Sequence, residues 1–378
     1  MIRRTTLTRR VRLAAFVLLG GLPFVPGLAW SDASLVFGVQ SRQLDIDTGI
    51  EGLAPVFNTQ TSARVNYTWE MSERWTVVAQ GGAARSFLEL TDQTLSGPTD
   101  ARLRVLFRPD DAWAIGCGTI VPLGLYELSA AEVTTAQWTW VPRSGFPITR
   151  FGEGWGFEAN VAYGRALSRD WTLGLGAAWL RHAEFPLLSG GAGDYQLADE
   201  TSLSLALDND LGRSRRLRLD LAYRAYGYDR LEGIDWGNQG SSLDLGSALD
   251  LPIGRFRTAA SVRVGLKGDN RLTDGTNPDS LFTFTQSPGL NLSADARAAT
   301  AFGSRWLLSL ESRYLLTSES DYFGGTADGN SIAFGPGLGC RLSRALSLSA
   351  RYMYVTGRGK FDLSLSGHDV LFTVELRQ

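Results

Sequence analysis

Hydrophobic and polar side chains alternate with a period of two residues along most of the chain after Asp32. Residues 215–229 illustrate the pattern, because one face is largely apolar and the other largely charged. The apolar face carries Leu217, Leu219, Leu221 and Tyr223, and the polar face carries Arg216, Arg218, Asp220 and Arg224. Such alternation predicts a β-strand whose two faces meet different surroundings. Soluble β-sandwiches alternate in the same way, so the connections between strands decide the fold class.

The pattern predicts sixteen strands joined by links of two kinds. We expect strands at 34–44, 62–70, 75–86, 100–108, 112–122, 156–166, 170–182, 199–211, 215–229, 242–251, 256–268, 287–302, 306–318, 331–342, 346–356 and 368–377. Seven short turns alternate with eight long loops that are rich in Gly, Asp and Pro. This asymmetry is typical of an antiparallel transmembrane β-barrel with short periplasmic turns and long extracellular loops. Phe361, Leu363 and Leu365 alternate out of phase with Val370 onward, which leaves the strand number open by two and suggests a bulge near Gly367 or an extended outer hairpin.

Aromatic side chains recur at the ends of the short turns. They are Trp69, Trp75, Phe107, Trp113, Trp171, Phe256 and Trp306. Amphipathic rings settle at the boundary between lipid and water, so this series predicts a periplasmic aromatic girdle around the barrel.

The first residues have the profile of a secretory signal peptide. Arginines at positions 3, 4, 9, 10 and 12 precede an uncharged run from Leu13 to Ser31, and no acidic residue occurs before Asp32. Pro23 and Pro26 argue against a retained membrane helix. We therefore expect residues 1–31 to be a signal peptide and 32–378 to be the barrel, with cleavage after Ala29 as the alternative. No membrane helix is expected after Asp32.

Composition excludes several other classes. Hydrophobic residues make up 44% of the 378, which is too many for a disordered chain. Two Cys and two His leave few candidates for disulfide, metal or cofactor chemistry, and we predict two free thiols at Cys117 and Cys340. Without its first 31 residues the chain has 32 basic and 39 acidic residues, and this negative balance does not favour nucleic acid.

Opposite charges face each other when the short hairpins are paired on paper. A turn at 303–305 places Asp295 opposite Arg313 and Arg297 opposite Glu311, and a turn at 212–214 places Asp208 opposite Arg218 and Asp210 opposite Arg216. A four-residue turn at 252–255 would place Asp250 opposite Arg257 and Asp244 opposite Arg263.

If apolar side chains meet lipid, the charged set lines the lumen. The predicted lining consists of Arg64, Arg102, Arg104, Asp208, Arg216, Arg218, Asp220, Arg224, Asp244, Asp250, Arg257, Arg263, Lys267, Asp295, Arg297, Glu311, Arg313 and Arg351. A wall with this many charges must be wet, because burying unpaired charges is costly. Six cations have no assigned partner, namely Arg64, Arg102, Arg104, Arg224, Lys267 and Arg351. We expect a water-filled channel that mildly prefers anionic or polar solutes; the alternative is a barrel braced by arginines and plugged by its loops.

The third outer loop, residues 123–155, is the candidate constriction. Its proposed constriction residues are Glu127, Glu132, Trp138, Trp140, Arg143, Phe146 and Arg150. So many aromatic side chains are not expected to stand in water, so they pack on the rim, enter the lumen or meet a partner. The loop occupies the position that folds inward in trimeric porins, which the chain resembles in plan.

Two hairpins also resemble a particular family. Residues 97–107 read GPTDARLRVLF and 113–124 read WAIGCGTIVPLG; residues 156–164 read GFEANVAYG and 167–174 read LSRDWTLG. These segments resemble the outer-membrane barrels grouped with meta-pathway phenol-degradation genes. The resemblance covers less than a fifth of the chain and implies a channel for small hydrophobic or aromatic compounds.

Two other functions and several partners remain open at this point. An outer-membrane enzyme of the lipase or protease kind could use His182, or His368 with Asp369 and Ser364 or Ser366. A structural or adhesive barrel could act through its loops. Expected partners are outer-membrane lipid and lipopolysaccharide, the barrel-assembly machinery, a small solute, and a possible second copy through the small residues Ala294, Ala296 and Ala298; we expect no cofactor.

Overall fold

The computed structural model describes most of the chain after residue 32. The described residues are 33–47, 55–124, 128–129, 132, 135–136, 139, 145–149, 151–186, 194–212, 214–273, 283–318, 320, 328–360 and 362–378. The chain divides into two units, residues 1–31 and 32–378. The expected signal peptide, 1–31, lies outside the described residues.

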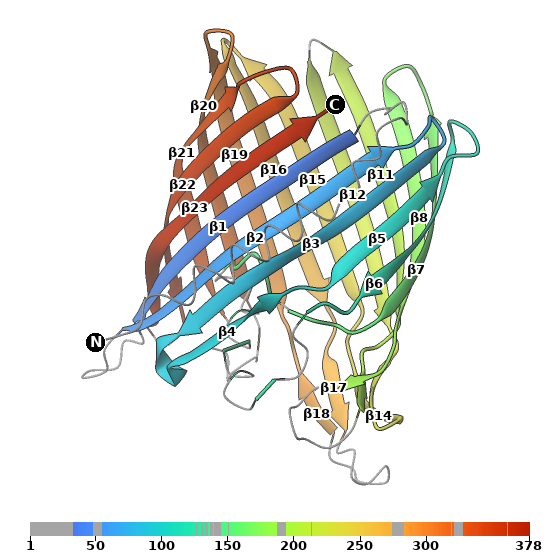
Figure 1. Ribbon diagram of the computed structural model, residues 1–378, viewed down its shortest axis with the longest axis vertical. Helices are drawn as coiled ribbons and strands as arrows, with labels where there is room; N and C mark the ends of the chain where they lie inside the picture. Colours follow the sequence, from blue (N-terminus) through green and yellow to red (C-terminus); the bar gives the residue numbers. More distant parts are fainter. Residues whose placement is uncertain are drawn as a thin grey trace, which may run out of the picture. The chain divides into compact units, whose positions relative to one another are not determined.

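Long antiparallel strands run obliquely around a barrel (Figure 1). They are β1 (Ala33–Asp47), β2 (Val56–Glu70), β3 (Trp75–Leu88), β4 (Gln93–Pro98), β5 (Ala101–Phe107), β6 (Trp113–Val121), β7 (Gly156–Ala166), β8 (Trp171–His182), β11 (Glu200–Gly212), β12 (Arg215–Tyr226), β15 (Ser242–Ile253), β16 (Phe256–Lys267), β19 (Leu290–Phe302), β20 (Trp306–Ser318), β21 (Gly329–Arg341), β22 (Leu346–Gly359) and β23 (Ser364–Arg377). The sheet closes because β1 pairs with both β2 and β23. Its 17 described strands fill sixteen positions, since β4 and β5 pair with β3 one after the other. The predicted sixteen-stranded, all-β antiparallel barrel is confirmed.

The long connections build a second, smaller sheet beyond the loop end of the barrel, which the sequence pattern did not predict (Figure 1). Its strands are β9 (Phe185–Pro186), β10 (Asp194–Gln196), β13 (Tyr228–Leu231), β14 (Ile234–Asn238), β17 (Asn270–Thr273) and β18 (Thr283–Gln286). Tyr195 of β10 is buried in this sheet, and its hydroxyl donates a hydrogen bond to Asp229 at 2.8 Å. The Tyr195 ring meets Phe185 and Trp236 edge to face at 5.8 and 6.1 Å, so the outer loops have a small core of their own.

The two faces of the barrel follow from strand register, because paired residues share a face. Gln60 on β2 contacts the backbone of Ile148, a residue of the third loop, and so marks the inner face. The register between neighbouring strands extends this inner face around the barrel. For example, Arg104, Gly118 and Glu158 lie side by side on three successive strands. Alternate residues such as Leu203, Leu205 and Leu219 point the other way and are exposed on the outside. In the described part of the chain, no helix has the length and apolar character needed to cross a bilayer.

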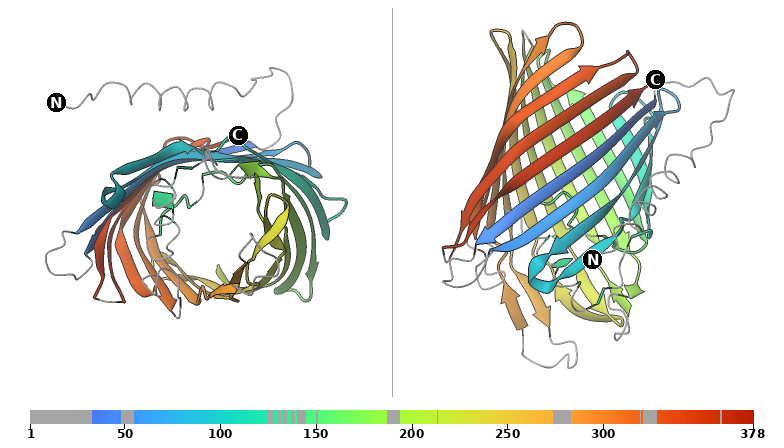
Figure 2. Two further views of the ribbon diagram at one scale, coloured as in Figure 1. Left: turned by 90° about the horizontal axis from the view of Figure 1, so that it is seen from below. Right: turned by 60° about the vertical axis from the view of Figure 1, so that its left-hand side comes forward.

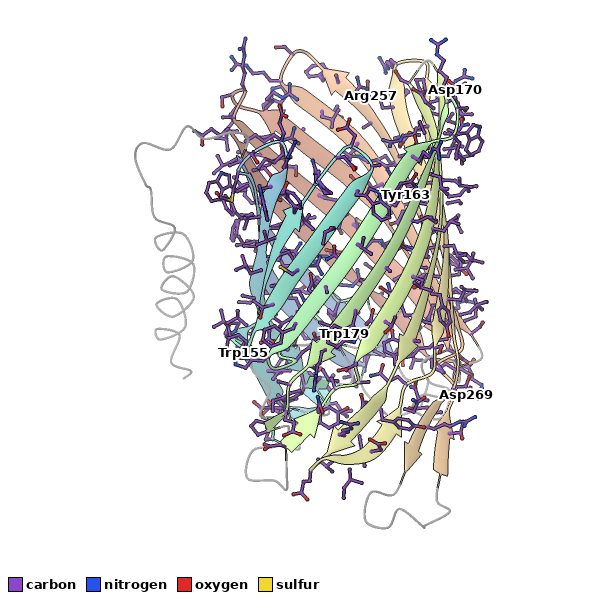
Figure 3. All side chains as sticks on the ribbon, turned by 90° about the vertical axis from the view of Figure 1, so that its right-hand side faces the viewer. Trp155, Tyr163, Asp170, Trp179, Arg257 and Asp269 are labelled. Carbon is purple, nitrogen blue, oxygen red and sulfur yellow. The ribbon has the colours of Figure 1, made fainter. Side chains whose placement is uncertain are left out.

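Aromatic side chains form the predicted girdle at the short-turn end. All seven predicted rings lie on the outward face, and Trp75 packs against Phe107 with ring centres 4.6 Å apart. Trp113 packs in the same way against Tyr163 at 4.8 Å. Figure 3 labels Tyr163 near the short-turn end, and Trp155 and Trp179 near the loop end, where a second group of aromatics faces outward. The outer surface therefore has the two interfacial belts expected of a membrane-spanning barrel.

The predicted register holds for two of the three hairpins. Asp295 pairs with Arg313 and Arg297 with Glu311, and Asp208 and Asp210 pair with Arg218 and Arg216 as expected.

The third hairpin departs from the prediction by two residues. The ladder continues to Ile253 opposite Phe256, so only Gly254 and Arg255 form the turn, and Gly254 supplies the required left-handed backbone at φ +59°. As a result Asp250 lies opposite Ala259, and Gly246 opposite Arg263. The predicted pairing of Asp250 with Arg257 and of Asp244 with Arg263 is therefore wrong, because a two-residue turn replaces the four-residue turn assumed.

The out-of-phase leucines near the end of the chain need no bulge. Register in β23 is continuous from Ser364 to Leu376 against β22, so Leu365 points inward and Val370 outward. Leu365 is buried against the third loop, which gives this inward position an apolar neighbour in place of water. Both Cys117 and Cys340 are free, as predicted, and lie on the outward face.

The loss of stability caused by a charged side chain in the barrel wall depends on whether that side chain faces lipid or the lumen. Leu205→Arg puts a guanidinium against lipid near the middle of β11 and should lower the free energy of unfolding by about 2–4 kcal/mol. The neighbouring change Ser204→Arg points into the lumen and should cost much less. Denaturant titration in lipid vesicles measures both, and equal losses for the two variants would contradict the assigned faces.

Candidate functional site

All of the predicted lining residues lie on the inner face of the barrel by register. Those on β11, β12, β15 and β16 form what we term the charged wall. In it Arg216 bonds Asp208 with Nε–Oδ1 at 2.7 Å, and Arg224 bonds Asp244 at 3.1 Å. At the short-turn end this wall borders a hollow of about 520 Å³ that Asp208, Arg216 and Asp250 help to line.

Several ion pairs reach across an intervening strand, over a glycine. Arg104 on β5 pairs with Glu158 on β7, and Gly118 of β6 lies between them in the same register line. A Cβ on Gly118 would lie 2.8 Å from Glu158 Cγ, so only glycine leaves room for the crossing. Asp220 and Arg263 meet at 3.6 Å across Gly246 of β15 in the same manner.

These crossings overturn part of the expected surplus of positive charge. Four of the six cations that lacked an assigned partner have a carboxylate partner: Arg102 with Glu153 at 3.0 Å, Arg104 with Glu158, Arg224 with Asp244 and Arg351 with Glu311 at 3.3 Å. Lys267 lies 5.5 Å from the centre of the Tyr226 ring and 3.5 Å from the Gln239 amide oxygen. Arg64 donates to Gln40 at 3.1 Å and stays exposed in the lumen. The expectation was wrong because it paired only residues directly opposite each other in one hairpin. The partners of Arg104 and Arg351 lie two strands away, that of Arg102 lies in the third loop, and that of Arg224 lies diagonally on the next strand.

A buried carboxylate, Asp369, lies on the opposite side of the lumen, where the sequence, which suggested it only as a catalytic acid, did not place it. Asp369 is 1% exposed and accepts hydrogen bonds from Gln40 at 2.8 Å and from Arg42 at 3.1 Å. Arg351 approaches it at 4.0 Å. Arg42 itself is 1% exposed, which is unusual for an arginine and requires a carboxylate partner. The sequence did contain a signal for this pair. The alternation predicts that Arg42 and Asp369 both face inward, and they lie on the first and last strands, which must pair to close the barrel.

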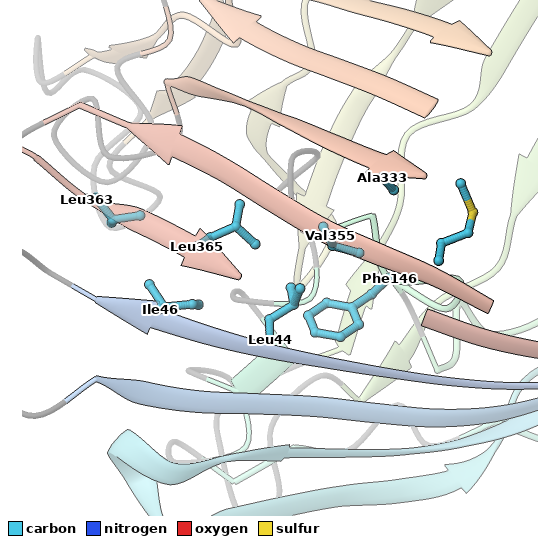
Figure 4. Close-up of a cluster of buried hydrophobic side chains, with 8 residues drawn as sticks. Leu44, Ile46, Phe146, Ala333, Val355, Leu363 and Leu365 are labelled. Atoms are coloured by element: carbon cyan, nitrogen blue, oxygen red, sulfur yellow. The ribbon is translucent and has the colours of Figure 1, made fainter. Parts of the chain in front are cut away.

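The third loop packs against this same region, which we term the covered wall: the inner faces of β1–β4 and β21–β23. Phe146 is buried among apolar side chains of the wall (Figure 4). They are Leu44, Ile46, Ala333, Met353, Val355, Leu363 and Leu365. A green part of the loop is visible inside the ring of strands when the barrel is viewed from below (Figure 2, left). The loop thus lies within the barrel where it is described.

Polar contacts fix the same loop to the wall. The Gln60 side-chain amide donates to the Ile148 carbonyl at 2.7 Å and accepts from the Ile148 amide at 2.9 Å, so it replaces the two bonds of a ladder partner. Gln60 also donates to Ser86 at 2.9 Å. A second apolar cluster then joins the loop to β3 and β4, through Ala136, Ile148 and Phe151 on the loop and Ala84 and Leu95 on the strands.

Only part of the predicted constriction set can be placed. Phe146 lies inside the barrel as described, while the Glu132 carboxylate accepts bonds from the Ser129 amide and hydroxyl, both at 2.8 Å, and so acts within the loop. Glu127, Trp138, Trp140, Arg143 and Arg150 lie outside the described residues.

The residues considered for an enzyme are not brought together. His182 lies on the inner face of β8, whereas His368 lies on the outer face of β23 with Nδ1 2.7 Å from the Tyr352 hydroxyl. Ser364 and Ser366 share the outward face with His368, but Asp369 points to the opposite side of the wall. A nucleophile, base and orienting acid within hydrogen-bond reach are therefore not formed by these residues.

Comparison with known proteins gives likenesses of fold. No protein-family model matches the sequence, and no curated protein matches it. Among solved structures, the chain is similar to the monoaromatic hydrocarbon channel CymD, at 11% identity and a TM-score of 0.43 over 92% of this chain and 88% of that one. It is also similar to OccK1 (OpdK) of Pseudomonas aeruginosa, at 11% identity and a TM-score of 0.46 over 92% and 98% of the two chains. For OprD of the same organism the values are 10%, 0.44, 93% and 99%.

The buried pair of Arg42 and Asp369 gives a test of how the covered wall is held together. Asp369→Ala leaves Arg42 buried without its carboxylate and should lower the free energy of unfolding by about 3–5 kcal/mol. The double change Arg42→Met with Asp369→Leu should cost less than Asp369→Ala alone, because no charge is left buried.

Asp235→Ala serves as the control, since it breaks an exposed pair with Arg230 in the outer sheet and should cost less than about 1 kcal/mol. Denaturant unfolding in detergent micelles measures all three variants. An Asp369→Ala loss as small as that of the control would mean that the Arg42 site is hydrated.

Proposed function

We propose that the protein is an outer-membrane channel through which small solutes diffuse passively along a charged, water-filled lumen. The observation that carries the proposal is the exposure of inward-facing charges on the charged wall. Arg216, Arg218 and Arg263 keep 56%, 53% and 63% of their side-chain surface exposed, although all three point into the barrel. Charged groups pointing into a closed barrel can stay exposed only if water fills the space in front of them.

The third loop narrows this lumen from one side. Its described contacts with Phe146, Ile148 and Phe151 lie on the covered wall, and the charged wall faces it across the lumen. A plugged barrel, the alternative, would require loops against both walls. Solutes are therefore proposed to pass between the loop and the charged wall.

The expected mild preference for anions is still proposed, and it is assigned to one arginine-rich part of the inner face. Ion pairs and electrostatic contacts connect five arginines and three carboxylates on the inner face between Asp369 and β19. They are Arg42, Arg64, Arg297, Arg313 and Arg351, with Asp295, Glu311 and Asp369. Arg64 is the member of this group that bonds a neutral amide and faces the lumen. The ion pairs elsewhere on the wall make a strong selectivity unexpected.

The remaining partners follow from an outer-membrane barrel. Residues 1–31 would direct export, lipid and lipopolysaccharide would surround the apolar outer surface, and the barrel-assembly machinery would insert it. A homo-oligomer remains a proposal that the outward-facing Ala294, Ala296 and Ala298 would allow by permitting close approach.

Channel activity is tested by reconstitution into a planar lipid bilayer. The purified barrel should give stepwise conductance, and deletion of residues 127–150 should raise the single-channel conductance because it removes the inward-folded loop. A folded barrel without conductance steps would reject the channel, and unchanged conductance in the deletion variant would reject the constriction.

The anion preference is tested by the reversal potential in a salt gradient. Arg64→Gln should shift the reversal potential toward cation selectivity, because it removes an exposed cation from the lumen. Arg165→Gln is the matched control, since Arg165 lies on the outward face of β7. Equal reversal potentials for Arg64→Gln and the control would contradict a role for Arg64.

A further inference from the structure

The Asp100 side chain lies at the break between β4 and β5, which together occupy the fourth strand position of the barrel. Strand pairing passes from β4 to β5 across Thr99 and Asp100, and the Thr99 amide still donates to the Gly82 carbonyl of β3 at 2.8 Å. Asp100 precedes Ala101, whose partner Val121 is the last residue of β6. The interruption thus places a carboxylate at the outer end of the wall, beside the two limbs of the third loop.

The Asp100 carboxylate binds both limbs of that loop. Its Oδ1 accepts a hydrogen bond from the Gly124 amide at 2.8 Å, where the loop begins, and its Oδ2 accepts one from the Glu153 amide at 2.5 Å, where the loop ends. The Asp100 amide donates to the Phe151 carbonyl at 3.2 Å. One residue therefore bonds the start of the loop, its end and, through Phe151, the apolar cluster that packs on β3 and β4.

The packing around Gly124 leaves no room for a side chain at that position. A Cβ on Gly124 would lie 1.9 Å from the Phe151 carbonyl oxygen and 2.7 Å from Asp100 Oδ1. The two limbs therefore approach as closely as glycine allows. Arg102, the next inward-facing residue after Asp100, pairs with the Glu153 side chain at 3.0 Å and so binds the second limb as well.

We propose that Asp100 is the positioning residue of the channel: by joining the two limbs at one carboxylate, it holds the loop in the place where it narrows the lumen. The proposal rests on the proposed channel function and assigns a role to a residue outside the charged lining. A carboxylate is needed because its two oxygens each accept one of two diverging amides. An amide side chain has a single acceptor and can retain one of the two bonds.

The experiment compares Asp100→Ala with Asp100→Asn and with a matched control elsewhere. Asp110 accepts the amides of Ala112 and Trp113, both at 2.8 Å, in a short turn at the opposite end of the barrel. Asp110→Ala therefore also removes two amide-to-carboxylate bonds, both of them to Oδ1, without touching the loop. Amide hydrogen exchange of peptides containing Gly124 and Glu153 is measured together with single-channel conductance in planar bilayers.

Asp100→Ala should speed exchange at both limbs about tenfold or more and raise the mean or the variability of conductance. Asp100→Asn should lose protection at one limb and retain it at the other. Asp110→Ala should change neither quantity. Unaltered exchange at both limbs in Asp100→Ala, or equal effects in Asp110→Ala, would overturn the proposal.

The two proposals fail differently. If the wild-type protein folds but does not conduct, the channel function is rejected, and exchange still decides whether Asp100 joins the limbs. If the wild-type protein conducts, and Asp100→Ala speeds exchange at both limbs but leaves the conductance unchanged, the positioning role is rejected and the channel function stands. If Asp100→Ala does not fold, the one-sided loss in Asp100→Asn decides.

Discussion

The structure depends on one constraint, that backbone hydrogen-bonding groups must be satisfied where no water reaches them. In hydrocarbon an unpaired amide or carbonyl costs several kcal/mol, so strands can span a membrane only when the sheet has no free edge. The pairing of β1 with β23 meets this condition, and it does so over the full length of both strands. Period-two alternation then follows, because every residue of a closed single-layer sheet faces either lipid or the lumen.

The lumen is asymmetric because the described part of the third loop packs on one side of it. On the covered wall, inward positions are apolar or neutral where the loop packs, as at Leu44 and Gln60, and a buried ion pair forms between Arg42 and Asp369. On the charged wall, the inward-facing Arg216, Arg218 and Arg263 stay exposed and form ion pairs with inward-facing carboxylates. Gly246 allows the Asp220–Arg263 pair of this wall to cross an intervening strand, and Gly118 does the same for Arg104 and Glu158 on β5–β7, so side chains as well as the backbone ladder join the strands.

Much of the fold could be predicted because it depends on local signals. Alternation located the strands, the lengths of the connections indicated a membrane barrel, and the position of Trp75 and Trp113 beside short turns located the girdle. Contacts that depend on what fills the lumen could not be predicted in this way. Leu365 was out of phase because its inward neighbour is Phe146, a residue more than two hundred positions away. The turn at Gly254 differed by two residues because several hairpin lengths preserve the same facing.

The sequence predicted which way the proposed lining residues face, but not how they pair. Every proposed lining residue faces inward, since parity alone fixes that property. Arg104 and Arg351 were expected to lack partners, however, because their carboxylates lie two strands away and a search of adjacent strands omits them. Asp100 gave no sequence signal, since its role depends on where both limbs of a long loop return to the wall.

Alternate side chains meet lipid and a wet lumen around a closed sheet. Single cysteines at successive positions from 217 to 223 of β12, in a background where Cys117 and Cys340 are serine, test this alternation most directly. A membrane-impermeant thiol reagent should label positions 218, 220 and 222, while lipid-borne quenchers should reach probes at 217, 219, 221 and 223. Uniform labelling along the strand, or labelling in the opposite phase, would contradict it.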